Sequence, residues 1–403
     1  MENSTQAKPL GQFEFITLMA FITSFVALAT DAMLPALSII GNDLGVANPN
    51  HNQYIISLMF LGLAIGQVFY GPWSDTVGRK IAIYVGFCVF LIGCFLSYFS
   101  ESFTTMMIGR VLQGLGLAGP RVVVMALIRD LYAGRAMARV MSFISAVFIM
   151  VPALAPILGV IILNFSGWRA IFGSFIFLGL IVLAWFALRQ PETLVPEKRI
   201  SLTVKKLATN AIEVFTSRQA IGYTLASGFI FGAFVTYLST SQQVFQTVYG
   251  LDETTFALWF AVLAIFIGAA SLLNGKLVMT LGMRKLTMVA LVISIVLAAI
   301  LLLLSLSYDG KPPFWTFILL FSAIFFCTGI LFGNLMALSM EPLGHIAGIG
   351  AAITSATSNL MSIPLAIFFG SLFAGTATPL IASFLILPAV GLLIMFWVEK
   401  DRS

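Results

Sequence analysis

The sequence predicts an all-α membrane protein with twelve transmembrane helices. Of its 403 residues, 60% are hydrophobic and 9% are Asp, Glu, Lys or Arg, and the mean hydropathy is +1.04. A soluble domain carries roughly 25% charged residues, so this chain has too few to cover a surface in contact with water. The composition therefore excludes a soluble enzyme, a disordered chain and a protein that binds nucleic acid.

Apolar runs of about 20 residues, the length that crosses ~30 Å of hydrocarbon, recur twelve times along the chain. The first run is longer than the apolar region of a cleavable signal peptide, and no basic segment precedes it beyond Lys8. We therefore expect it to be the first membrane helix. The predicted spans are 13–38, 52–73, 80–99, 103–126, 138–163, 169–189, 219–241, 253–275, 286–307, 313–337, 346–371 and 376–398.

The distribution of Lys and Arg predicts the orientation and the domains. With the N-terminus inside, 17 of the 21 basic residues fall in cytoplasmic segments, whereas Arg169 and Lys311 fall outside. Both termini are therefore expected in the cytoplasm. A charged segment separates six spans from six. We expect an N-terminal six-helix bundle (1–189), a cytoplasmic central loop (190–217) and a C-terminal six-helix bundle (218–403).

A short internal repeat supports this division. Residues 71–80, after the second span, and residues 275–284, after the eighth, both read Gly, six residues, Gly and then a basic residue within two positions. Their offset of 204 residues is about half the chain. Six spans return the chain to its starting side, so the repeat predicts two pseudo-symmetric bundles related as parallel repeats.

Two ionisable residues lie deep within predicted spans. Asp31 is in the first span, where a carboxylate costs ~2.5–3.5 kcal/mol, so it should face a cavity or a partner. Proton carrying is favoured over the alternative of a carboxylate hydrated near the outer surface. Arg110, in the fourth span, lies at a similar depth of about 10 Å and would meet Asp31 if the two helices are neighbours. The alternative for this pair is a static structural ion pair.

Several further residues are candidates for contact with a ligand. Arg121 is eleven residues beyond Arg110 and faces the same way, so it either presents charge to a cavity or extends to the cytoplasmic surface. Gln113 is a polar group one turn from Arg110, or a helix-packing hydrogen bond. Aromatic residues crowd the seventh span. The predicted substrate-binding set is Asp31, Gln113, Arg121, Phe148, Phe229, Phe234 and Tyr237.

A second set of residues is predicted to serve conformational change. Two prolines four residues apart deform the fifth span, either as a fixed kink or to let the helix rock, and a nearby glycine allows close approach. The tight turn after the second span carries a carboxylate and basic groups that would form contacts in one state of a switch, or remain solvated. This set is Gly71, Asp75, Gly78, Arg79, Pro152, Pro156 and Gly159.

The sequence predicts neither a metal site nor a cofactor. Cys88, Cys94 and Cys327 form no CxxC pair, and the two histidines are far apart, which argues against a disulfide scaffold, a zinc site or a haem site. We expect the three cysteines to be buried and structural.

These features together resemble the major facilitator superfamily and, more narrowly, the Bcr/CflA group of drug:proton antiporters. The resemblance covers most of the N-terminal half, whereas the C-terminal half is similar mainly in pattern. The segments that carry it are Asp31–Leu37, Gly66–Lys80, Arg110–Gly116, Ile128–Tyr132, Pro152–Pro156 and Trp168–Phe172.

The resemblance implies roles for particular residues. It implies that Asp31 couples protons to substrate, that Arg110 is the antiporter-motif arginine of helix four, and that Asp75 and Arg79 belong to the gating loop. Residues Pro152–Gly159 resemble the antiporter motif of helix five.

The sequence also departs from the family pattern. Ala155 and Val160 replace frequent glycines of the helix-five motif, and Thr76 replaces a basic residue of the gating loop. Thr23 stands where some related carriers have a second carboxylate, which favours neutral over cationic drugs. Arg121 matches no family position.

The function implied is proton-coupled efflux of neutral or amphipathic drugs, such as phenicols or bicyclomycin, by alternating access. The protein would be a monomer in the bacterial inner membrane, its partners would be the drug, protons and the bilayer, and the proton gradient would be its energy source. One alternative is a proton-coupled symporter that imports a nutrient. From another class, a membrane sensor without transport remains open. An intramembrane enzyme would need paired aspartates, a Ser/His pair or metal ligands at one depth, and the sequence shows none.

Overall fold

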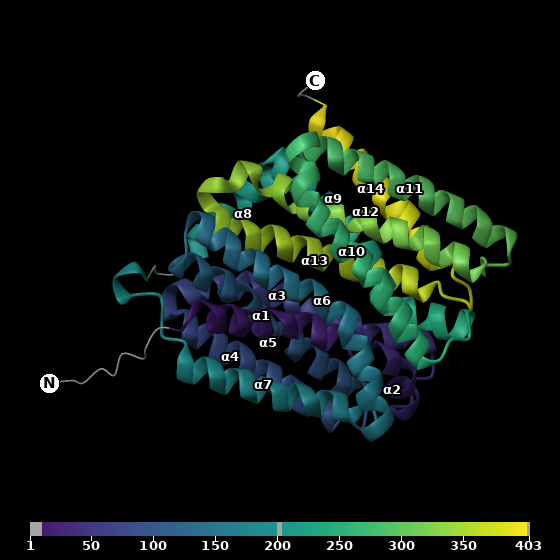
Figure 1. Cartoon of the computed structure of the whole chain (residues 1–403), viewed down its shortest axis with the longest axis horizontal. Coiled ribbons are helices and arrows are strands. Elements are labelled where there is room, and N and C mark those ends of the chain that lie inside the picture. The colour runs from purple at the N-terminus through teal and green to yellow at the C-terminus, as the bar shows by residue number, and fades with distance from the viewer. Residues whose placement is uncertain (1–9, 200–203, 401–403) are drawn as a thin grey trace.

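The computed structural model describes residues 10–199 and 204–400, and within these ranges it is helical without any strand. Its long helices lie side by side along one direction (Figure 1). The elements are α1 (Gln12–Asp31), η1 (Leu34–Ala36), α2 (Leu37–Asp43), η2 (Pro49–Gln53), α3 (Tyr54–Val77), α4 (Arg79–Tyr98), α5 (Phe103–Leu131), α6 (Gly134–Ser166), α7 (Arg169–Arg189), η3 (Pro196–Lys198), α8 (Val204–Thr216), α9 (Arg218–Gln242), η4 (Gln243–Val248), α10 (Glu253–Leu281), α11 (Met283–Ser307), α12 (Phe314–Met340), η5 (Glu341–Ile346), α13 (Ala347–Ser371) and α14 (Thr378–Glu399).

The described helices provide the twelve predicted spans. Eleven apolar helical stretches are long enough to cross a membrane, and one of them, Phe314–Ser371, has 58 residues. That stretch consists of α12 with 27 residues and α13 with 25, joined by the short η5. Each of these helices is itself long enough to cross ~30 Å of hydrocarbon. The chain is therefore an all-α membrane protein with twelve transmembrane helices.

The first span, predicted over 13–38 with a local bend permitted by Pro35, is broken after Asp31. Helix α1 ends at Asp31, and the next turn is the 3₁₀ segment η1, which contains Pro35. Proline lacks an N–H group and clashes with the carbonyl four residues earlier, so the α-helical ladder stops before it. Asp31 is consequently the last residue of a helix.

The N-terminal helices (α1–α7) and the C-terminal helices (α9–α14) occupy different parts of the molecule in Figure 1. The two groups meet where α3 packs on α13 and where α6 packs on α10. The predicted central loop contains a helix, α8, whose Val214 is buried with Ala220, Leu343 and Ile353.

Glycines bring the backbones of the N-terminal helices together. A Cβ atom on Gly62 of α3 would overlap the carbonyl oxygen of Val111 on α5, and one on Gly114 would overlap the carbonyl oxygen of Met59 on α3. Small residues at helix crossings allow this approach, which lets dispersion and weak polar contacts stabilise helix pairs in lipid. The close contact holds α5, and with it Arg110 and Arg121, at a fixed distance from α3.

The expectation for the cysteines is wrong at one position. Cys94 and Cys327 are buried, but Cys88 is exposed, and none of the three is in a disulfide. Cys88 lies on the outward stripe of α4 that also carries Ile81, Val85 and Ile92, all exposed. That stripe is apolar because it faces lipid, so an apolar neighbourhood in the sequence did not indicate burial.

We predict that Gly114→Ala destabilises the protein by about 1–3 kcal/mol, because the added methyl group collides with backbone rather than with a movable side chain. Thermal unfolding in detergent would measure the change. Gly275→Ala is the matched control, since a Cβ atom there meets nothing within 4 Å. Equal unfolding temperatures for the two variants would contradict this account of the α3–α5 contact.

Candidate functional site

Asp31 is a buried carboxylic acid without a partner. Its exposed fraction is 4%, and among the described residues it forms no hydrogen bond and no ion pair. It lies at the C-terminal end of α1, where the helix dipole is negative and gives a carboxylate no support. Its electrostatic neighbour is the Tyr237 side chain of α9. The site therefore brings together two predicted residues from opposite groups of helices.

Arg110 is held by its own group of helices and does not form the predicted pair with Asp31. Its Nε atom donates to the carbonyl oxygen of Ile55 at 2.8 Å, one terminal nitrogen donates to Gln113, and the other lies 2.8 Å from the sulfur of Met59. A matching depth of Asp31 and Arg110 is not enough to form an ion pair, because the Arg110 guanidinium points toward α3. Thr30, the residue before Asp31, also reaches the Met59 sulfur, at 3.6 Å. The Met59 side chain therefore lies between Thr30 and Arg110.

Gln113 completes this network. Its Nε2 atom donates to the carbonyl oxygen of Gly93 at 3.1 Å and to Ser97 Oγ at 2.9 Å, both on α4. The side chain is fully buried. In this conformation it joins Arg110 to the packing of α4 and α5, as the alternative of a helix-packing hydrogen bond expects, and its contact with substrate stays a prediction.

Arg121 differs from Arg110 although both face the same way on α5. Its side chain is partly exposed, and no ion pair or hydrogen bond to it occurs in the described part of the chain. An unpaired guanidinium inside a membrane protein is expensive unless it lines a water-filled cavity or meets a ligand. Arg121 is therefore an arginine within a span that has no protein partner among the described residues.

The predicted aromatic face is partly assembled. Phe234 and Tyr237 stack at 6.5 Å between ring centroids, and Tyr237 also contacts Phe260 and Phe325 at 5.4 and 4.7 Å. Phe229 and Phe148 have no ring contact in this cluster of described residues. Five residues along a helix is about 500°, so Phe229 and Phe234 point in different directions.

A polar stretch at the end of α9 was missed by the sequence reasoning. Residues 239–243 read Ser-Thr-Ser-Gln-Gln and are all buried, and the helix then changes to the π-helical turn η4. Such turns are frequent at functional sites. The hydroxyls of Tyr237 and Ser239 have no hydrogen-bond partner, and Gln246 donates to the carbonyl oxygen of Pro35 at 3.5 Å. Five successive polar residues in an apolar span were the visible signal.

The two groups of helices are joined near α2 by a set of contacts that we name the outer clasp: Asn50, Gln243, Ser371 and Phe373. Asn50 Nδ2 donates to the carbonyl oxygens of Ser371 and Phe373 at 3.3 and 2.9 Å. Gln243 Nε2 donates to Asn50 Oδ1 at 3.1 Å. Because these bonds cross between the N-terminal and C-terminal helices, they close the molecule at this end.

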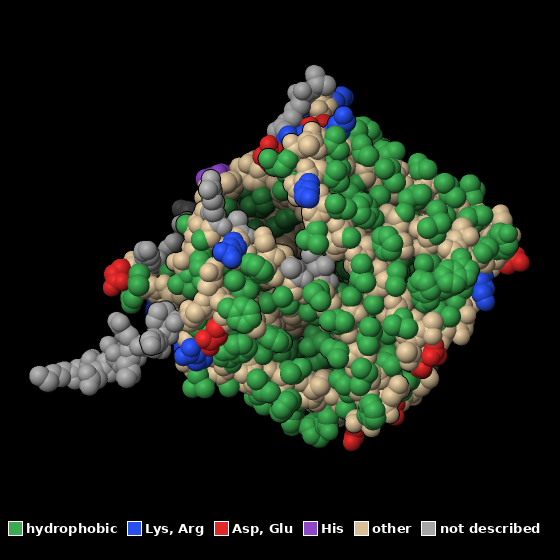
Figure 2. Space-filling view, in the orientation of Figure 1, with side chains coloured by type: hydrophobic (Ala, Val, Ile, Leu, Met, Phe, Trp, Pro, Cys, Tyr) green, Lys and Arg blue, Asp and Glu red, His purple; other side chains and the backbone are tan. Residues whose placement is uncertain are grey.

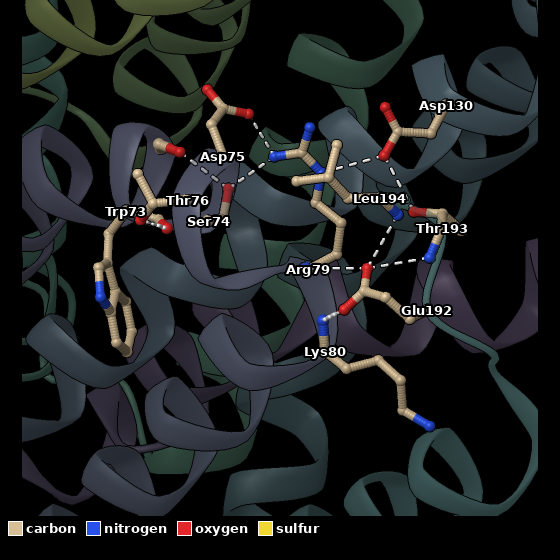
Figure 3. A network of polar contacts seen from close by, with 11 residues as sticks. Trp73, Ser74, Asp75, Thr76, Arg79, Lys80, Asp130, Glu192, Thr193 and Leu194 are labelled. Atoms are coloured by element: carbon tan, nitrogen blue, oxygen red, sulfur yellow. Dashed lines mark hydrogen bonds and ion pairs between the residues drawn. The ribbon is translucent and has the colours of Figure 1, made fainter. Parts of the chain in front are cut away.

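The opposite end of the molecule carries the predicted gating residues. Arg79 donates to Asp75 at 2.5 Å, to Ser74 at 2.8 Å and to Asp130 at 3.0 Å (Figure 3). Glu192 accepts hydrogen bonds from the backbone N–H groups of residues 79 and 80, both at 3.0 Å. These N–H groups lie in the first turn of α4, where the helix itself offers them no acceptor.

This network belongs entirely to the N-terminal helices and the segment that follows them. Asp75 lines a small pocket with Gly348 and Ile349 of α13, so it also faces the other group. Gly71 lies in the same pocket, and Gly78 has a φ of 109°, a backbone conformation that favours glycine. Figure 2 shows a hollow in this face beside α8, at the end opposite the clasp.

Helix α6 meets the first span at its break. Pro152 and Pro156 lie inside α6, and a Cβ atom on Gly159 would overlap the carbonyl oxygen of Ala32, the residue after Asp31. Any movement of α6 therefore acts directly on the backbone beside the buried carboxyl group. No group of three or more potential metal ligands occurs within 10–199 and 204–400.

Comparison with known proteins gives one family. The model of the family described as "Major Facilitator Superfamily" matches residues 19–366. The chain is 27% identical over 390 residues to the "Uncharacterized MFS-type transporter YdgK" of Bacillus subtilis strain 168, covering 95% of this chain and 96% of that protein. It is 28% identical over 372 residues to the "Bicyclomycin resistance protein homolog" of Haemophilus influenzae, covering 92% of each. The fold is similar to that of a D-xylose-proton symporter, with a TM-score of 0.75 at 16% identity, over 96% of this chain and 97% of that one.

We predict that Asn50→Ala favours opening of the molecule at the end near α2. The substitution removes the three side-chain hydrogen bonds that Asn50 makes in the clasp. Each is worth about 1 kcal/mol, so the open population should rise at least about fivefold. Spin labels on Ala47 and Ala374, both exposed near the clasp, would report longer distances by double electron–electron resonance. Asn42→Ala, a change at an exposed position of the same region, should leave the distances unchanged. An unchanged distribution in Asn50→Ala would mean that the clasp does not hold this end closed.

Proposed function

The chain belongs to the Major Facilitator Superfamily, and from that premise we propose that it exports drugs in exchange for protons. It is a multi-pass transporter of the bacterial inner membrane. The observation that carries the proposal is Asp31, a buried carboxyl group without a cation that faces the helices of the other group.

Coupling follows from where this carboxyl group lies. Because Asp31 is beside Tyr237 of α9, rearrangement of the two groups of helices changes its surroundings. Once protonated, the Asp31 side chain carries no charge, and the carrier turns inward. Drug binding and loss of the proton to the cytoplasm return it outward. Since drug and proton share one site, each excludes the other, and the two fluxes run in opposite directions.

Arg110 would act at a fixed place in this cycle. Its bonds to Ile55 and Gln113 hold it in the N-terminal helices, and the Met59 side chain lies between it and Thr30, the residue before Asp31. In this conformation Arg110 forms no ion pair with Asp31. We propose that Arg110 stabilises the deprotonated state when helix movement brings α1 closer to it.

The substrate would be a neutral or amphipathic drug of the phenicol or bicyclomycin type. The aromatic cluster around Tyr237 offers flat apolar surface, and the unpartnered hydroxyls of Tyr237 and Ser239 offer hydrogen bonds to drug hydroxyl and carbonyl groups. Arg121 adds a donor for an electron-rich oxygen. The name of the bicyclomycin-resistance relative supports this class.

The proton gradient supplies enough free energy for this cycle without a cofactor. One proton crossing 100 mV yields ~2.3 kcal/mol, and each pH unit adds about 1.4 kcal/mol, which supports drug gradients of hundreds-fold. We propose that a monomer suffices, since both groups of helices that form the site belong to one chain.

A proton-coupled importer is the second candidate, favoured by one observation. Ser355 and Asn359 of α13 both donate to Gln67 Oε1 of α3, at 3.1 and 3.2 Å. An amide-rich contact between the two groups of helices suits a hydroxylated nutrient. The direction of coupled flux separates the two candidates.

We predict that Asp31→Asn abolishes uphill transport, since the amide takes up no proton. Proteoliposomes with an imposed pH gradient would be followed for chloramphenicol flux and lumenal pH together. The wild type should move drug against its gradient while protons flow the other way. Co-flow of drug and protons would instead indicate import.

Asp252→Asn is the matched control for this experiment. Asp252 caps α10 by accepting from the N–H of Thr255 at 3.1 Å, and asparagine caps helices equally well. This variant should transport like the wild type. Uphill transport by Asp31→Asn at the wild-type rate would give Asp31 a structural role and refute the mechanism.

We predict that Arg121→Gln raises the KM for a phenicol about tenfold, by loss of a charge-assisted hydrogen bond. The ratio of drug to protons should stay the same, because Arg121 is not the proton carrier. Arg121→Lys keeps the charge and should lie closer to the wild type in KM. An unchanged KM in both variants would assign Arg121 to helix packing.

A further inference from the structure

A groove of about 530 Å³ lies between α1 and α6, away from the site described above. Its floor and walls are apolar and aromatic, and its rim carries Arg139 of α6. The lining consists of Gln12, Phe13, Ile16, Thr17, Ala20, Phe21, Arg139, Phe143 and Val147. Large exposed apolar residues are frequent on this protein, so the distinguishing feature is a concave surface with a cation at one end.

The groove lies between these helices toward their N-terminal ends. Farther along, the helices are in close contact where Gly159 of α6 meets the carbonyl oxygen of Ala32. Pro152 and Pro156 lie in the sequence of α6 between this contact and the groove. Both helices begin at the same end, since residues 12–21 of one line the groove with residues 139–147 of the other.

The dimensions of the groove match one leaflet of a bilayer. The nine residue steps from Gln12 to Phe21 rise about 14 Å along the helix. Half of the ~30 Å hydrocarbon core is a similar length. The apolar lining therefore extends from the membrane surface to about its middle, and the cation lies at the headgroup end.

The charge of the groove favours an anionic headgroup. Arg139 is exposed and has no ion pair or hydrogen bond in the described part of the chain. No carboxylate is among the residues that line the groove. Glu14, which lies nearby in the sequence, is bound instead to Arg189 and Trp185 of α7, at 2.8 and 3.1 Å.

We propose that this groove holds one anionic phospholipid, with an acyl chain between Phe21 and Phe143 and its phosphate on Arg139. An arginine guanidinium binds a phosphate group through two hydrogen bonds at once. An acyl chain fills an apolar groove favourably, because apolar surface is poorly hydrated. The lipid fills the space between α1 and α6. It contacts the part of α6 that precedes Pro152 and Pro156, whereas Gly159 follows them. This binding is independent of which drug is transported.

The test is a lipid titration of the purified full-length protein, with native mass spectrometry to count bound lipids. The probes are phosphatidylglycerol and phosphatidylcholine of the same chain length. Wild type should bind one phosphatidylglycerol about tenfold more tightly than phosphatidylcholine. Arg139→Ala, an exposed change that leaves the packing intact, should remove this preference.

Two further variants separate charge from shape. Thr17→Phe fills the groove and should weaken both lipids alike, whereas Lys285→Ala removes an exposed cation of α11 outside the groove and should change neither. Retained preference in Arg139→Ala, or no preference in the wild type, overturns the proposal. Release of phosphatidylglycerol by chloramphenicol also overturns it, because the groove would then accept the drug itself.

Discussion

Every polar group that this chain places in the hydrocarbon must find its partner within the protein, because lipid supplies none. The backbone meets this constraint by being helical throughout the described spans. The side chains meet it in two ways. Arg110 and Gln113 bond to each other and to the α3 and α4 backbones and are fully buried. Asp31 and the Tyr237 hydroxyl, which are close enough to interact electrostatically, have no hydrogen bond among the described residues. The first set fixes the helices, and the second is where we propose that a proton or a ligand binds.

The two arginines of α5 show how packing assigns different roles to similar residues. Eleven residues apart, they face the same way, and the sequence offered each a cavity or a structural role. Arg110 lies where glycines press α3 and α4 onto α5, so carbonyl oxygens come within reach of its guanidinium. Arg121 lies beyond that tight zone, is partly exposed and has no described partner. A mobile ion pair between Asp31 and Arg110 would require Arg110 to leave several bonds, which favours a fixed position.

The fold was predictable because a membrane helix needs an uninterrupted apolar run, and twelve such runs are visible. Other features required three-dimensional information. The break after Asp31 depends on how Pro35 is accommodated, and a proline in a membrane helix is also compatible with a mild bend. Depth matching suggested that Asp31 would meet Arg110, but rotation about each helix axis decides which side chains meet. The polar stretch 239–243 is visible in the sequence, at the end of the predicted seventh span. The roles of all these residues in transport remain predictions.

The arrangement of α6 links the membrane to the buried carboxyl group. At one end its Gly159 leaves no room between the helix and the backbone beside Asp31, so a shift of α6 there cannot be absorbed by side chains. At the other end the same helix borders the apolar groove, with two prolines between the two regions. Each proline removes one hydrogen bond from the helix between these two regions, so α6 is weakest there. The outer clasp closes the end near Gly159, while the hollow lies at the opposite end. Opening the clasp would therefore alter the surroundings of Asp31 and admit water at the same moment. The proposed exchange of a proton on one side only requires these two changes to occur together.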